Sequence, residues 1–402
     1  MEEGGETMRL CQKIALLFLV LFLPAAASVQ AEQEEKKSPD IGAVAEEQLG
    51  QLGMNDLSVY WDQLLKTYGQ YLPETERQPL TDLFKEGQAF SFSTWAKGLL
   101  SFVFHELYAN GKLLGTLILL TVFSVFLQIL QNAFEQGTVG KTAYSVVLIV
   151  LLILALNSFR LAMEYATEAV DQMIQFLLAL MPILLALLAS TGGAISATVF
   201  HPFLLFLMNI SGLVIQKVVL PLLFFSTLLS VVSLFSTHYK ATKLADLLRH
   251  WSVGLLSAFM AIYLAIVSIQ GSAAAVADGL AIRTAKFFAG NFIPVVGKMF
   301  TEAADTVMSA SLLLKNTIGI AGAGILLLIV AFPALKIFAL VLVYKIAGAI
   351  LQPLGDETIT ECLEIIGKNM TYVFAALVIV SFMFLLSIVI LVAASNVTMM
   401  IR

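Results

Sequence analysis

The residues of this chain that could perform chemistry do not complete a catalytic pattern. Gly140-Lys141-Thr142 matches the end of a phosphate-binding loop, but the first glycine of that loop is replaced by Glu135 and no strand precedes it. His105-Glu106 begins like a zinc-protease motif, yet the position of the second histidine holds Ala109. The four histidines have no ligand spacing, and no nucleophile shares a context with a base. We therefore expect no enzyme, no metal and no cofactor.

A second set of polar residues is more informative because it lies inside apolar segments. Polar groups in lipid are costly, so they usually face a bundle interior, a wet cavity or the membrane interface. The alternative is structural: Lys217 extends to the interface and the amides bridge helices. The residues concerned are His201, Asn209, Gln216 and Lys217 in one segment and Asn291, Lys298, Glu302 and Asp305 in another.

Composition predicts the solvent of the protein. The chain has 402 residues, of which 59% are hydrophobic and 13% charged. A soluble protein carries about 25% charged residues, so a chain this apolar needs lipid around it. The net charge of −5 argues against nucleic acid as a partner. We predict an all-α, polytopic helical membrane protein.

The N-terminal region is different in character. Residues 1–31 resemble a signal peptide, with Arg9 and Lys13 before a short apolar stretch and Ala31 at a cleavage site. An uncleaved anchor is the alternative. Residues 32–95 predict a small acidic helical domain outside the cytoplasm, and 96–112 predict an interfacial helix.

Nine apolar runs follow. They are 113–132, 143–163, 173–189, 198–215, 216–236, 251–270, 316–332, 334–351 and 371–395. Lys240, Lys243 and Arg249 favour a cytoplasmic location for 237–250, between two of these runs.

A fixed offset of 112 residues suggests an internal repeat. It aligns Pro182 with Pro294, Gly212 with Gly324 and Pro221 with Pro333, and coincidence in a biased sequence is the alternative. Two parallel tandem repeats would each contain a proline-broken hairpin. The predicted divisions are a transmembrane hairpin at 113–163, repeat A at 164–270, repeat B at 271–395 and a tail at 396–402.

Paired broken helices at matching positions of two repeats point to a transport pathway. The hairpins are predicted to be centred on 191–193 and on 302–305, and to line or gate that pathway. The candidate pathway residues are Pro182, Gly192, Gly193, His201, Lys217, Asn291, Pro294, Lys298, Glu302 and Asp305.

The stretch from Gly290 to Lys315, with Asn291-Phe292-Ile293-Pro294 near its start, resembles the stage III sporulation protein AE family of endospore-forming bacteria. The signal peptide, the Leu52–Glu74 helical segment and the chain length agree with this resemblance. It implies a multi-span protein of the mother-cell membrane around the forespore, with its N-terminal domain outside the cytoplasm. It also implies part of a secretion-like channel, as a candidate pore or export gate.

The implied partners are other membrane and ring proteins of the stage III sporulation operon, a cytoplasmic secretion-type ATPase, a forespore membrane protein and further copies of the chain. Two other functions remain open. A secondary transporter for a small solute would show ion-coupled uptake by the purified protein. A scaffold that anchors soluble ring proteins would function after the hairpins are changed.

Overall fold

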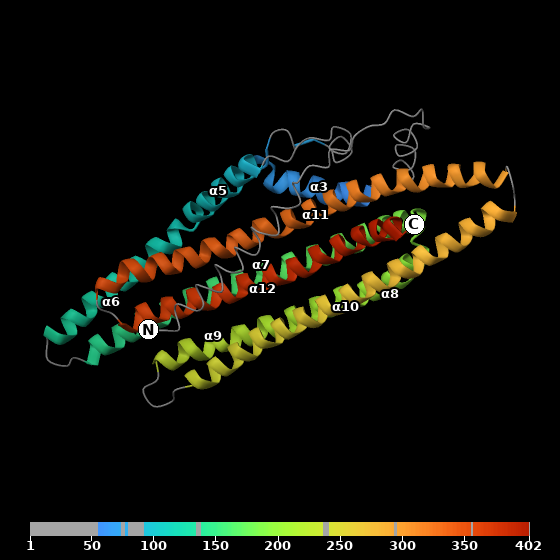
Figure 1. Ribbon diagram of the computed structural model, residues 1–402. Helices are drawn as coiled ribbons and strands as arrows, with labels where there is room; N and C mark the ends of the chain where they lie inside the picture. Colours follow the sequence, from blue (N-terminus) through green and yellow to red (C-terminus); the bar gives the residue numbers. More distant parts are fainter. Residues whose placement is uncertain are drawn as a thin grey trace. The chain divides into compact units, whose positions relative to one another are not determined.

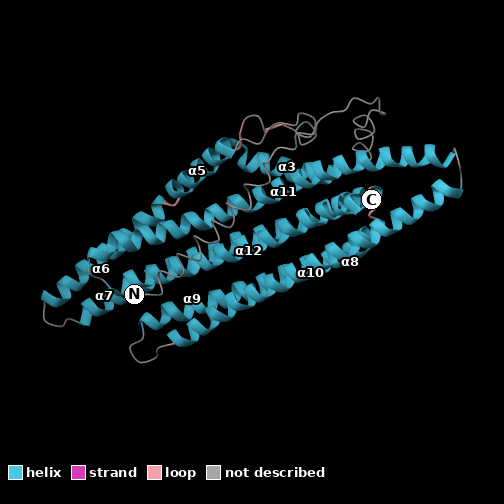
Figure 2. Cartoon of the chain, in the orientation of Figure 1, coloured by secondary structure: helices cyan, strands magenta, loops and turns pink. Residues whose placement is uncertain are grey.

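The computed structural model describes residues 55–73, 77–78, 92–133, 138–235, 241–292, 296–354 and 357–401. All of them belong to the second of two units, Met1–Asp40 and Ile41–Arg402. Every regular element among them is a helix, which confirms the all-α prediction (Figure 2). The predicted signal peptide and most of the acidic domain lie outside the described residues.

The described N-terminal elements that lead into the bundle are α3 (Asn55–Tyr68), the short 3-10 helix η2 (Gly69–Tyr71), α5 (Phe92–Ala109) and α6 (Gly111–Ala133). Helix α3 buries Leu57, Trp61 and Leu64, which are spaced along one helical face. This face packs against α7 and α11.

The bundle consists of α7 (Thr138–Ser190), α8 (Ala194–Val214), the wide π-helical segment η4 (Ile215–Val219), α9 (Leu220–Phe235), α10 (Thr242–Phe292), α11 (Val296–Leu351), the 3-10 helix η5 (Gln352–Leu354) and α12 (Glu357–Ile401). Helix α12 contacts α7, α9, α10 and α11, and it lies between α11 and α10 in Figure 1. Because α12 continues to Ile401, residues 396–401 of the predicted tail belong to this helix.

Six helices of the described residues are long and apolar enough to cross a membrane. The nine apolar runs do not correspond to nine separate helices, because 143–163 and 173–189 belong to the single helix α7. The predicted limits at 163/164 and 270/271 fall inside α7 and α10. Hydropathy falls at 160–175, but that stretch has no glycine or proline to end a helix.

The predicted proline breaks also need correction. Pro182 lies inside the continuous helix α7, where neighbouring helices can satisfy the freed carbonyl group, and Pro294 lies outside the described residues. Residues 302–305 are not a hairpin tip, because α11 runs through them and Glu302, Ala303 and Ala304 are good helix formers. Helix α10 ends at Phe292 and α11 begins at Val296, and residues 293–295 between them lie outside the described residues.

The proposed repeat has mixed support from helix boundaries. The turn at 191–193 corresponds, at the offset of 112 residues, to 303–305 inside α11, so the leading parts of the two units differ. In the later parts of the two units, Thr242–His250 and Thr358–Lys368 both lie at the start of a helix. The superposition of the two units stays a prediction.

Candidate functional site

The turn between α7 and α8 is the first candidate region, and its backbone is well satisfied. The Gly193 N–H donates to the Leu188 carbonyl at 2.9 Å, and the Gly192 N–H donates to the Ala189 carbonyl at 3.0 Å. This pair of bonds is the Schellman motif that ends many helices. The Thr191 hydroxyl adds a bond to the Leu188 carbonyl at 2.8 Å.

Gly192 has a φ of 90°, in the left-handed region that favours glycine. A Cβ atom on Gly192 would lie 2.5 Å from Ile282 Cδ1 of α10 and 3.5 Å from Met308 Cε of α11. The turn is thus wedged against two other helices. The backbone is also close at Gly193, since a Cβ atom there would lie 2.8 Å from the Leu188 oxygen.

Helix α8 begins without a capping side chain of its own, because its N-cap residue is Gly193. Asp278 of α10 supplies the cap instead. Its carboxylate accepts bonds from the Ile195 N–H at 2.9 Å and the Ser196 N–H at 3.1 Å, and Asp278 is buried. A carboxylate at a helix N-terminus satisfies free amides and complements the helix dipole. Asp278 therefore fixes the turn to α10.

Further buried polar groups join α12 to α11 and to α10. The fully buried Lys315 donates from Nζ to the Val392 carbonyl of α12 at 3.1 Å. Five residues before Val392 on α12, the Ser387 hydroxyl is hydrogen-bonded to the hydroxyl of Tyr263 on α10. Buried groups of this kind hold helix pairs in one register when they find partners.

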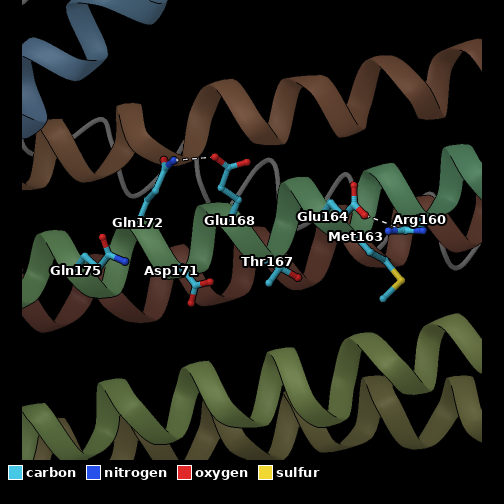
Figure 3. Close-up of a pocket in the computed structure, with 8 residues that line it drawn as sticks. All are labelled: Arg160, Met163, Glu164, Thr167, Glu168, Asp171, Gln172 and Gln175. Atoms are coloured by element: carbon cyan, nitrogen blue, oxygen red, sulfur yellow. Dashed lines mark hydrogen bonds and ion pairs between the residues drawn. The ribbon is translucent and has the colours of Figure 1, made fainter.

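The second candidate region is a polar face in the middle of α7, shown in Figure 3. We call it the α7 polar face. Its residues come from successive turns of one helix and lie side by side on the surface. They are Arg160, Met163, Glu164, Thr167, Glu168, Asp171, Gln172 and Gln175.

The α7 polar face carries three carboxylates against one guanidinium. Arg160 Nε pairs with Glu164 Oε1 at 2.8 Å, but both side chains stay more than half exposed, at 72% and 55%. Gln172 Nε2 donates to Glu168 Oε1 at 3.3 Å. The face is therefore acidic and open to its surroundings.

The π-helical segment η4, which lies between α8 and α9 in the chain, contacts the α7 polar face. Gln216 Nε2 donates to Asp171 Oδ1 at 2.6 Å. The wide turn comes just before Pro221, which has no N–H to donate to the Lys217 carbonyl four residues earlier. Single π turns of this kind are frequent at functional sites.

The segments of α7 before and after the α7 polar face are apolar. The span Thr142–Ser190 has 49 residues and would extend about 74 Å, whereas a hydrocarbon layer is about 30 Å thick. Exposed charges in lipid are expensive. This face must therefore meet water or polar groups of another protein.

The predicted pathway residues that the structure describes lie on several elements. Pro182 is exposed in α7, Gly192 and Gly193 form the turn, His201 is exposed on α8, and Lys217 is exposed in η4. Asn291 belongs to α10, and Lys298, Glu302 and Asp305 belong to α11, but their side chains lie outside the described residues. Pro294 also lies outside them.

Sequence reasoning missed Asp278, Lys315 and the whole α7 polar face. The polar face had a signal, because Arg160, Glu164 and Glu168 recur every four residues without a helix breaker. No local sequence pattern indicates the role of Asp278, because the amides that it caps lie more than 80 residues away in the chain. Among the described residues, no group of three His, Cys, Asp or Glu side chains is placed to hold a metal ion.

Comparison with known proteins gives the family. The model of the stage III sporulation protein AE family matches residues 76–395. The chain belongs to this family. It is 52% identical over 399 residues to the stage III sporulation protein AE of Bacillus subtilis (strain 168), covering 98% of this chain and 100% of that protein. No solved structure matches. This chain is thus a sporulation protein, and six helices in its described part are long and apolar enough to span a membrane.

Proposed function

We propose that this protein is a multi-span subunit of a channel-like complex between the mother cell and the forespore, and that it forms part of the conduit or export gate. The α7 polar face carries this proposal. A charged, exposed face between two apolar stretches of one membrane helix suits the wall of an aqueous path. The face is acidic, so two copies would repel in direct contact but tolerate each other across water.

The proposal includes the location and partners that family membership suggests. The protein would lie in the mother-cell membrane around the forespore, with its N-terminal domain outside the cytoplasm. It would assemble with further copies of itself, other stage III operon proteins and a forespore membrane protein. A secretion-type ATPase would act from the cytoplasmic side.

Flux through reconstituted vesicles tests the proposal. The protein is reconstituted with the neighbouring operon products, as the parent and as the double variant Glu168→Gln/Asp171→Asn. These changes remove two charges of the α7 polar face and keep side-chain size. We expect altered flux of small ions and impaired sporulation at normal protein level.

The matched control is Glu357→Gln/Glu361→Gln, which removes two exposed charges from the first turns of α12. It should leave flux and sporulation unchanged. Normal flux and normal sporulation in the Glu168/Asp171 variant would contradict the proposal and favour a scaffold. Ion-coupled solute uptake by the purified protein alone would favour a secondary transporter.

A further inference from the structure

The first turns of α10 carry an apolar stripe that the described part of the chain leaves exposed. Leu244, Leu247 and Trp251 are 51%, 50% and 69% exposed. They lie on one face of the helix because they are three and four residues apart. An exposed apolar surface of this kind usually marks a contact with lipid or with another protein.

The opposite side of this part of α10 is fixed to the bundle. Ala245 is fully buried, and the Ser252 hydroxyl donates to the Val219 carbonyl of η4 at 3.1 Å. The guanidinium carbon of Arg249 lies 5.7 Å from the ring centroid of Tyr372 on α12. These contacts set the rotation of α10 about its own axis, so the apolar stripe is held outward.

The start of α12 offers a comparison within the same molecule. Thr358–Lys368 lies at the start of α12 as Thr242–His250 lies at the start of α10, and both stretches mix apolar and charged residues. In α12, however, Ile359, Leu363 and Ile366 are fully buried. The bundle therefore covers the apolar face of the α12 start, whereas that of the α10 start remains available to a surface outside the chain.

The course of the stripe along α10 indicates that this surface is lipid. The stripe continues through the exposed residues Leu255, Ile262 and Ile269, all within the candidate membrane span Thr242–Ile269. No charged residue occurs from Trp251 to Ile269. At 1.5 Å per residue, this uncharged stretch is about 28 Å long, close to the hydrocarbon thickness of about 30 Å.

The residues next to Trp251 suit a phospholipid headgroup layer. Lys243 and His250 are exposed and lie two helix turns apart, just before the uncharged stretch. The Asp246 carboxylate is bonded to Arg249, and Lys243 forms no ion pair with the residues that the structure describes. Tryptophan is enriched at the membrane interface, and lysine is enriched on its cytoplasmic side, where headgroup phosphates attract it.

We propose that Thr242–Leu255, which we call the α10 anchor, binds the phospholipid headgroup layer at the cytoplasmic face of the membrane. Leu244 and Leu247 lie in that layer, as in interfacial amphipathic helices, and Trp251 marks the edge of the hydrocarbon. Lys243 contacts headgroup phosphate. The inference does not depend on the proposed conduit, because it uses only the membrane location of the protein.

Tryptophan quenching by brominated lipids tests the α10 anchor. The full chain is placed in nanodiscs whose lipids carry bromine either near the headgroup or near the chain ends. Trp61 and Trp95 are buried, so the difference between the parent and Trp251→Phe isolates the emission of Trp251. Bromine near the headgroup should quench this emission roughly twofold more strongly than bromine near the chain ends, because tryptophan prefers the interface.

Lys243→Gln tests the headgroup contact. Equal amounts of bromine are carried by phosphatidylglycerol or by phosphatidylcholine, and the parent should be quenched more by the anionic lipid. The variant should lower this preference roughly fivefold, as expected for one lysine at a membrane surface. Lys243→Arg should retain the preference. Lys66→Gln, which removes an exposed lysine of α3, is the matched control and should leave it unchanged.

Three results would count against the α10 anchor. Quenching of Trp251 by aqueous iodide but by neither brominated lipid would place the stripe in water. Protection from iodide and from both lipids would place it under another protein or a second copy of this chain. Either result overturns the anchor and leaves the conduit to its own flux test. An unchanged lipid preference in Lys243→Gln would overturn the phosphate contact.

Discussion

Replacement of Asp278 by alanine should destabilise the α7–α8 turn strongly. The side chain accepts two amide hydrogens at the start of α8, and it is 1% exposed, so water cannot replace it without local opening. Loss of an N-terminal cap costs about 0.5–2 kcal/mol, and leaving buried donors unpaired costs about 1–3 kcal/mol. We expect the free energy of unfolding to fall by about 2–4 kcal/mol.

Asp278→Asn should cost less, about 1 kcal/mol, because one acceptor oxygen remains while the charge is lost. Denaturant unfolding in mixed micelles, followed by helical circular dichroism, measures both values. Protease cleavage near residues 190–195 reports local opening of the turn. Asp62→Ala, at an exposed position of α3, is the control and should change the free energy by less than about 0.5 kcal/mol. If Asp278→Ala matched this control, the cap would have no energetic role and our reasoning about the turn would be refuted.

Three further predictions concern other parts of the molecule. Gly192→Ala should lower the free energy of unfolding by about 1–3 kcal/mol in the same micelle assay, because of its positive φ and the close Ile282 side chain. A cysteine at Lys243 should resist an impermeant reagent added outside the cell, and external labelling there would overturn the predicted topology. Docking of α3 should weaken as pH rises from 10 to 12, because Tyr68 holds its proton more tightly in the folded state and this contribution is lost through the folded pKa. Tryptophan fluorescence should follow this step, and Tyr68→Phe should abolish it.

Local sequence signals predicted the parts of the candidate site that depend on local structure. Gly192-Gly193 lies at the centre predicted for the first hairpin, and the structure has a helix-ending motif there. Hydropathy predicted membrane helices but misplaced their ends. It measures the average polarity of a window, whereas helix continuity depends on backbone propensity and on breakers. The stretch from Arg160 to Gln175 is polar on one face and helical throughout, so the two criteria disagree there.

The amino-acid sequence by itself determined that this is a helical membrane protein of the stage III sporulation protein AE family, because composition, apolar run length and family residues are properties of the chain alone. Only the tertiary structure decided which distant groups meet. The carboxylate of Asp278 caps two amides that lie 82 and 83 residues earlier in the chain. The ammonium group of Lys336 on α11 lies 5.8 Å from the ring centroid of Tyr68 on α3. Such pairings depend on the register and rotation of packed helices, which many side-chain contacts set together and no local pattern encodes.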